Sequence, residues 1–193
     1  GTTYQVTYAP GDTSPTDDHE SIEALLLEIN QSLSTYIETS LISTINRSSD
    51  TAVSHPVDDH FLTVFGQAAR VYRDTDGAFN PAVGPLVNAW GFGPEGATTT
   101  PDPASIASLL ELVDFDAFQM RPASRTLQKS VAGAELDFRA IAKGYGVDAA
   151  GELLGQRGIE AYFIEIGGEV LTRGQHPEGR PWRVGIERPA LTS

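Results

Sequence analysis

Three short segments rich in small residues contain the side chains best suited to chemistry on a bound ligand. Residues 137–148 place Asp137 and Lys143 on either side of a run of mostly small residues, residues 165–169 set two glycines between glutamates, and residues 76–93 combine glycine, proline and aromatic positions. Small residues let the backbone approach a ligand closely. Three such segments in one chain indicate a large, flat, anionic ligand.

Each residue of the charged pair in residues 137–148 has two possible roles. Lys143 suits a pyrophosphate as a point charge, reinforced by the N–H groups of a helix N-terminus, or it is a solvated surface lysine. It is one of only two lysines in the chain. Asp137 would accept hydrogen bonds from the ligand, or it caps a helix ahead of Ile141, and the two roles are compatible.

Aromatic and amide groups supply the remaining candidates. Tyr36 and Trp90 have the flat faces that stack on a ring system, although aromatic side chains most often pack in the core. Ala78, Phe79 and Asn80 could present backbone and amide groups to the ligand, or they form a turn set by the Asp-Gly step before them.

The composition excludes several classes of function. A net charge of −13 argues against a protein that binds the phosphate backbone of nucleic acid. The absence of cysteine excludes disulfides, thiolate metal sites and a cysteine nucleophile. The four histidines lack the spacing of metal ligands and are predicted to lie at the surface. No apolar run approaches the length of about 18 residues that a membrane span requires.

Hydrophobic periodicity and turn residues predict the elements that position these groups. Helices are expected at about 18–33, 59–72, 103–113 and 141–154. Residues 40–50 are expected to form a loop or a short helix, and residues 76–101 a loop. Strands are expected at 4–8, 118–128, 134–137, 161–166, 169–173 and 182–187. Strands and helices do not alternate regularly, and the late strands follow in hairpin order. The predicted fold class is α+β with a mainly antiparallel sheet packed with helices.

These motifs together resemble the ApbE family of flavin transferases. The resemblance is carried by residues 1–4, Leu33 to Tyr36 with Ser43 to Asn46, and the segments 76–93, 137–148, 165–169 and 182–187, in the family's order over nearly the whole chain. It implies a T-fold-like α+β domain. Members of the family bind FAD and, with Mg²⁺, transfer the FMN moiety to a threonine of a target flavoprotein, releasing AMP.

The resemblance also assigns roles to individual residues. It implies flavin contacts from Tyr36, Ala78, Phe79, Asn80, Asp137 and Lys143, and a backbone carbonyl from Ala140 as a ligand of magnesium, a hard cation that takes oxygen ligands. Asn80 stands where the family commonly has aspartate, which removes a charge near the flavin, and Leu41 stands where a glutamate is common. The target threonine is the nucleophile, so the chain needs none of its own.

The expected domain is residues 1–193, an ApbE-like flavin-binding domain that lacks the C-terminal portion of the family fold. That portion carries further magnesium ligands, so the chain alone is expected not to transfer FMN. Two alternatives stay open: an FAD pyrophosphatase that releases FMN and AMP, and a flavin-binding module without catalysis. The resemblance further implies an exported protein, periplasmic or on the outer face of the cytoplasmic membrane, lipid-anchored in its full-length form.

Overall fold

The computed structural model describes residues 2–9, 14–94, 96 and 99–186. The chain forms two compact units, one of Gly1–Glu23 with Gly146–Ser193 and one of Ala24–Tyr145. Two helices, α1 (Pro15–Leu33) and α6 (Arg139–Gln156), contribute residues to both units. None of the helices in the described part of the chain is long and apolar enough to span a bilayer.

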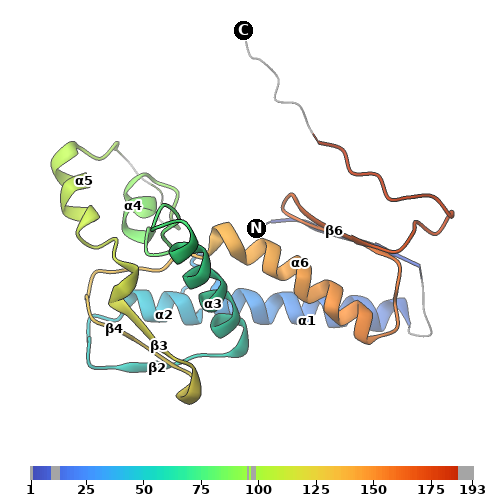
Figure 1. Cartoon of the computed structure of the whole chain (residues 1–193), viewed down its shortest axis with the longest axis horizontal. Helices are drawn as coiled ribbons and strands as arrows, with labels where there is room; N and C mark the ends of the chain where they lie inside the picture. The colour runs from blue at the N-terminus through green and yellow to red at the C-terminus, as the bar shows by residue number, and fades with distance from the viewer. Residues whose placement is uncertain (1, 10–13, 95, 97–98, 187–193) are drawn as a thin grey trace, which may run out of the picture. The chain divides into compact units, whose positions relative to one another are not determined.

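The first unit is built on an antiparallel sheet of three strands in the order β1 (Tyr4–Tyr8), β5 (Tyr162–Ile166) and β6 (Glu169–Arg173) (Figure 1). Residues of β5 alternate between buried and half-buried, as expected for a strand with one face toward a core. Gly167 and Gly168 both have positive φ, 55° and 95°, which the two central residues of a tight hairpin turn require. The three strands confirm the sequence prediction for this part of the chain.

Two predictions in the first unit are wrong. Residues 182–186 have no regular secondary structure although a strand was expected over 182–187; Glu187 lies outside the described residues. Helix α1 begins at Pro15 and not at about residue 18, so Asp18, which the sequence suggested as its cap together with Asp17, lies in its first turn. The fully buried Asp18 carboxylate instead pairs with Arg157, with 2.9 Å between Oδ1 and Nη1. Burial of a carboxylate requires such a partner.

The second unit contains the other sheet, also antiparallel, in the order β2 (Ser54–Pro56), β4 (Thr126–Lys129) and β3 (Phe118–Arg121). Figure 1 shows these strands side by side. The predicted strand 118–128 is in fact a hairpin, because a 3₁₀ turn, Pro122–Ser124, interrupts it and Arg125 adopts the left-handed conformation with φ 52°. A second 3₁₀ turn, Phe115–Ala117, precedes β3.

Two helices of the second unit begin at the residues expected from the sequence, each directly after an aspartate cap. Asp58 caps α3 (Asp59–Asp74) by accepting from the Phe61 N–H at 2.8 Å, and Asp102 caps α5 (Pro103–Leu110). The short helix α2 (Leu41–Arg47) has Ser40 as its cap. The expected loop 76–101 is interrupted by helix α4 (Gly84–Ala89), which has Pro85 in its first turn.

Aromatic rings fill the core of the second unit. Phe61 packs edge-on against Phe138 at 5.4 Å between centroids, and Phe65 lies 5.0 Å from Phe115. All four side chains are buried. Since Phe138 directly follows Asp137, burial of its ring fixes the start of α6 against the core.

Candidate functional site

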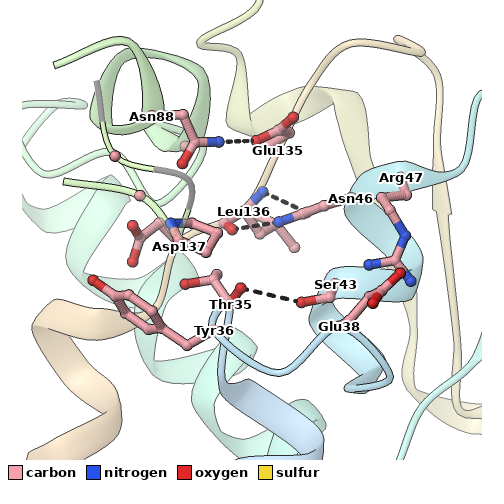
Figure 2. A pocket seen from close by; sticks show the side chains of 14 residues that line it. Thr35, Tyr36, Glu38, Ser43, Asn46, Arg47, Asn88, Glu135, Leu136 and Asp137 are labelled. Atoms are coloured by element: carbon pink, nitrogen blue, oxygen red, sulfur yellow. Dashed lines mark hydrogen bonds between the residues drawn. The ribbon is translucent and has the colours of Figure 1, made fainter. Parts of the chain in front are cut away.

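The backbone of residues 134–137 is held by groups from several different elements. It was predicted as a strand, but its only bridge among the described residues is a parallel one between Val83 and Glu135. The amide of Asn46, on α2, takes the place of a neighbouring strand at Leu136. Its Nδ2 donates to the Leu136 carbonyl and its Oδ1 accepts from the Leu136 N–H, both at 2.8 Å (Figure 2).

Both ends of this segment are fixed as well. The buried Lys129 donates from Nζ to the carbonyl oxygens of Ala134 at 3.2 Å and of Asn46 at 2.7 Å. Burial lowers the pKa of the Lys129 ammonium below its ordinary value. At the other end, the Asp137 N–H donates to the Pro81 carbonyl at 2.8 Å. Hydrogen bonds therefore hold the backbone in place along the whole segment that leads to Asp137.

Close packing of α4 completes the support. The Gly84 N–H donates to the Glu135 carbonyl at 3.3 Å, and a Cβ on Gly84 would lie 2.8 Å from that oxygen. The Asn88 side chain donates to the Glu135 carboxylate at 2.6 Å. Glycine is thus required at position 84 because the two backbones touch.

A cavity of about 470 Å³ opens beside this segment, within the range of small-molecule sites. Figure 2 shows Tyr36 and Asp137 on one side of it and Glu38, Ser43 and Arg47 on the other. All of its lining residues belong to the second unit: Thr35, Tyr36, Glu38, Ser43, Asn46, Arg47, Gly84, Asn88, Gly93, Pro94, Gly96, Glu135, Leu136 and Asp137.

At the edge of this pocket, Arg139 joins three segments of the chain. Its Nε and Nη2 donate to Asp137 Oδ2 at 2.8 and 2.6 Å, and its own N–H donates to Asp137 Oδ1 at 2.9 Å. Its Nη1 donates to the Tyr36 hydroxyl at 3.0 Å and to the Phe92 carbonyl. The Tyr36 hydroxyl in turn donates to the same carbonyl at 3.1 Å. The Asp137 carboxylate raises the pKa of the Arg139 guanidinium further above its ordinary value.

Sequence reasoning did not select Arg139, although it is the only charged residue between Asp137 and Lys143. This position inside the motif is the sequence signal that could have identified it. Of the predicted flavin contacts, Tyr36 and Asp137 are brought together at the pocket, and Arg139 is the side chain that connects them. Asp137 also accepts from the N–H of the first residue of α6, although the cap position itself is Phe138, whose carbonyl accepts from the Ala142 N–H at 2.7 Å.

The predicted contacts at residues 78–80 lie next to this segment but do not line the cavity. The Asn80 amide accepts from the Ala82 N–H at 2.9 Å and donates to the Val113 carbonyl at 3.3 Å. These bonds form the turn that presents Pro81, whose carbonyl holds Asp137. The turn interpretation of this loop is thus present in the structure, and its contact with a flavin stays a prediction.

Ala140 and Lys143 are the second and fifth residues of α6 and also do not line the cavity. A helical carbonyl such as that of Ala140 accepts from the N–H four residues on, which leaves one lone pair for a cation. Within the part of the chain that the structure describes, no group of three or more His, Asp or Glu side chains could hold a metal ion.

The histidines are less exposed than predicted. His19 is exposed, but His60 is half-buried, with its Nδ1 2.7 Å from the Tyr145 hydroxyl. His55 is also half-buried, and its buried Nε2 has no hydrogen-bond partner among the described residues. Burial, with the nearby Lys129 charge, lowers the pKa of His55.

Comparison with known proteins identifies the family. The ApbE family model matches residues 1–193. The chain belongs to the ApbE family. Among curated ApbE relatives, the FAD:protein FMN transferase of Haemophilus influenzae is 37% identical over 198 residues, covering 100% of this chain and 57% of that protein. The enzyme of the same name from Vibrio cholerae is 36% identical over 196 residues, covering 99% of this chain and 57% of its own length.

Solved ApbE structures share the fold described above. The flavin transferase ApbE from Vibrio cholerae matches with a TM-score of 0.91 at 36% identity, over 98% of this chain and 61% of that one. The apo form of the Pseudomonas stutzeri flavinyl transferase ApbE matches with a TM-score of 0.88 at 32% identity, over 97% and 60%. The predicted α+β class with antiparallel sheets is confirmed. This chain spans 57% of the length of each of these two curated ApbE relatives.

Proposed function

We propose that this chain binds FAD and, as part of the full-length protein, transfers the FMN moiety to a threonine of a target flavoprotein, releasing AMP. The names of the relatives support this activity, since they are FAD:protein FMN transferases at 36–37% identity. The observation that carries the proposal is the pocket of the second unit, where an exposed tyrosine ring stands beside a backbone segment held in a fixed position.

The pocket suits the flavin part of FAD. The Tyr36 ring is 60% exposed and offers an aromatic surface for a flat ring system. Asn46, Asn88 and Ser43 bring amide and hydroxyl groups to the same cavity, which suits a ligand with both donors and acceptors on its ring edges. We propose further flavin contacts from the carbonyl and amide groups of the loop 78–80, which lies next to the segment 134–137 but outside the lining of the cavity.

The diphosphate of FAD would lie toward the N-terminal half of α6. Lys143 is a point charge for it, and the N-terminus of this helix carries partial positive charge. We place magnesium in the proposal as well. When bound, it neutralises charge on the diphosphate. The Ala140 carbonyl is the only ligand that these residues are proposed to give it.

The reaction is a displacement at the phosphorus of the FMN half. The threonine oxygen of the target forms a bond to this phosphorus, the bond to the bridging oxygen breaks, and AMP leaves with that oxygen while the threonine loses its proton. Catalysis of this kind depends on positioning and charge stabilisation. Residues of this chain would hold the flavin half still while the leaving half departs.

Calorimetric titration with FAD tests the binding step. Wild-type protein is expected to bind FAD, and Lys143→Ala to bind it more weakly because a phosphate contact is lost. Arg121→Ala is the matched control, since Arg121 is exposed and bonds Ser54 and Gln128, none of which lines the pocket. Absence of FAD binding by the wild-type chain would refute the proposal.

Product analysis tests the reaction with the full-length protein. Incubation with FAD, magnesium and a threonine-bearing flavoprotein should give covalently flavinylated target and one AMP per flavin transferred. FMN and AMP formed equally without target would indicate the pyrophosphatase, and unchanged FAD would indicate a binding module. We also propose export and lipid anchoring of the full-length protein, a hypothesis that recovery of the native protein in the cytoplasmic fraction would exclude.

A further inference from the structure

The edge of the pocket is organised by one group of residues, which we call the Arg139 cluster: Arg139, Tyr36, Phe92 and Asp137. Its members come from three separate segments, the chain after α1, the chain after α4 and the start of α6. The two aromatic residues are the most exposed members, with Tyr36 at 60% and Phe92 at 69%. Side chains this exposed lack the packing that normally fixes an aromatic ring.

What holds Tyr36 in place is a closed set of hydrogen bonds. Its hydroxyl accepts from Arg139 Nη1 at 3.0 Å and donates to the Phe92 carbonyl at 3.1 Å, while Arg139 Nη1 also donates to that carbonyl. The guanidinium carbon lies 5.6 Å from the Tyr36 ring centroid. The other side of the guanidinium is fixed by the Asp137 carboxylate, which is only 8% exposed.

We infer that Arg139 is a positioning residue that holds Tyr36 and the chain at Phe92 against Asp137, so that the edge of the pocket is ordered before the ligand binds. The inference rests on the proposed function for its consequence, flavin affinity, but not for the ordering itself. An ordered ring has already lost its rotational freedom, so ligand binding need not restrict it again.

The role depends on the shape of the arginine side chain as well as on its charge. Arg139 uses Nε and Nη2 on one partner and Nη1 on two others, and a planar fork can reach all three at once. A lysine keeps the charge beside Asp137 but has a single nitrogen. Arg139→Lys therefore separates the fork geometry from the ion pair.

Hydrogen exchange in the ligand-free protein tests the ordering directly. The Phe92 N–H donates to the Val87 carbonyl, so its exchange reports whether the end of α4 stays closed. Arg139→Lys should accelerate exchange across residues 90–92 by about 5-fold for each hydrogen bond lost from this cluster. Tyr36→Phe, which leaves the ion pair between Arg139 and Asp137 intact, should also accelerate exchange across residues 90–92.

Arg121→Lys is the control, because Arg121 is an exposed arginine of the same unit that bonds Ser54 and Gln128. It should leave exchange at residues 90–92 unchanged. If Arg139→Lys and Tyr36→Phe also leave it unchanged, the inference is overturned, whatever the protein binds. A purely structural role would lower the melting temperature without this local acceleration.

FAD titration tests the consequence. Each single variant should bind FAD roughly 2- to 10-fold more weakly than wild type, the cost of fixing one free side chain on binding. The double variant should be no weaker than the weaker single, because both remove the same arrangement. The inferred effect on FAD affinity would be refuted if Arg139→Lys bound FAD as tightly as wild type. It would also be refuted if the losses of affinity were additive when Arg139→Lys and Tyr36→Phe are combined. A wild-type chain that binds no FAD would instead refute the proposed function, while the exchange result still decides the ordering.

Discussion

Replacing Asn46 with alanine should destabilise the protein more than its partial exposure suggests. The substitution removes both hydrogen bonds to the Leu136 backbone, each 2.8 Å long. Leu136 itself is fully buried, so its N–H and C=O would lose their partners in the interior. No second element of the described structure offers them a replacement.

The magnitude follows from those two groups. An unsatisfied buried donor or acceptor costs about 1–3 kcal/mol, so two cost roughly 2–6 kcal/mol. Asn46 lines the pocket, and water entering from there would satisfy part of the loss. We therefore expect a decrease of about 2–4 kcal/mol in the free energy of unfolding, and a melting temperature lower by roughly 4–16 °C for a domain of this size.

Urea denaturation followed by circular dichroism measures the loss as a shift of midpoint at constant slope. Asn88→Ala is the matched control, because the Asn88 amide makes one exposed hydrogen bond to Glu135 and should cost less than about 1 kcal/mol. Asn46→Asp keeps the acceptor but loses the donor, and should be nearly as damaging as alanine. An Asn46→Ala protein as stable as Asn88→Ala would refute the view that this amide holds the segment 134–137.

Three further substitutions or conditions test other parts of the structure. Gly84→Ala should lower the free energy of unfolding by about 1–3 kcal/mol, because its Cβ would lie 2.8 Å from a backbone carbonyl oxygen. Gly66→Ala, in a helix with open space around the site, should raise the free energy of unfolding by up to about 1 kcal/mol. Urea midpoints measure both changes. Asp58→Ala should lower the free energy of unfolding by about 0.5–2 kcal/mol by removing the cap of α3, whereas Asp59→Ala, which removes only an exposed ion pair with Arg125, should shift the urea midpoint less. The lowered pKa of His55 means that its contribution to stability is complete above about pH 6.5 and is lost as the pH falls through the lower value of the folded state. His55→Leu should flatten this decline in melting temperature between about pH 7 and pH 5, and an unchanged slope would contradict it.

The sequence predicted the helices α1, α3, α5 and α6 and the strands of the first unit well because their signals are local. A cap such as Asp58 or Asp102 stands directly before the helix that it starts, and the alternation of Tyr4, Val6 and Tyr8 with polar residues lies within the strand itself. The motif around Asp137 was recognised for the same reason, since its distinctive residues are contiguous.

Interactions between distant residues were not predictable in this way. Asn46 and Leu136 are 90 positions apart, and nothing in either local sequence indicates that a side-chain amide will replace a strand. The burial of Lys129 was missed because lysine is normally exposed, and its two carbonyl partners become visible only in the fold. Arg139 was overlooked because its partners Tyr36 and Phe92 come from other segments.

The side-chain amide at Leu136 has a consequence for the fidelity of folding. A ladder between two strands repeats along its length, so it can shift by two residues and form again with the same faces inward. A lone amide on a helix bonds a single residue, here the fully buried Leu136, which stands between Glu135 and Asp137, so a shift by one residue would bring a carboxylate into that buried position. The Asn46 amide and the buried Leu136 together therefore select one alignment of residues 134–137, and with it one position for the carboxylate of Asp137.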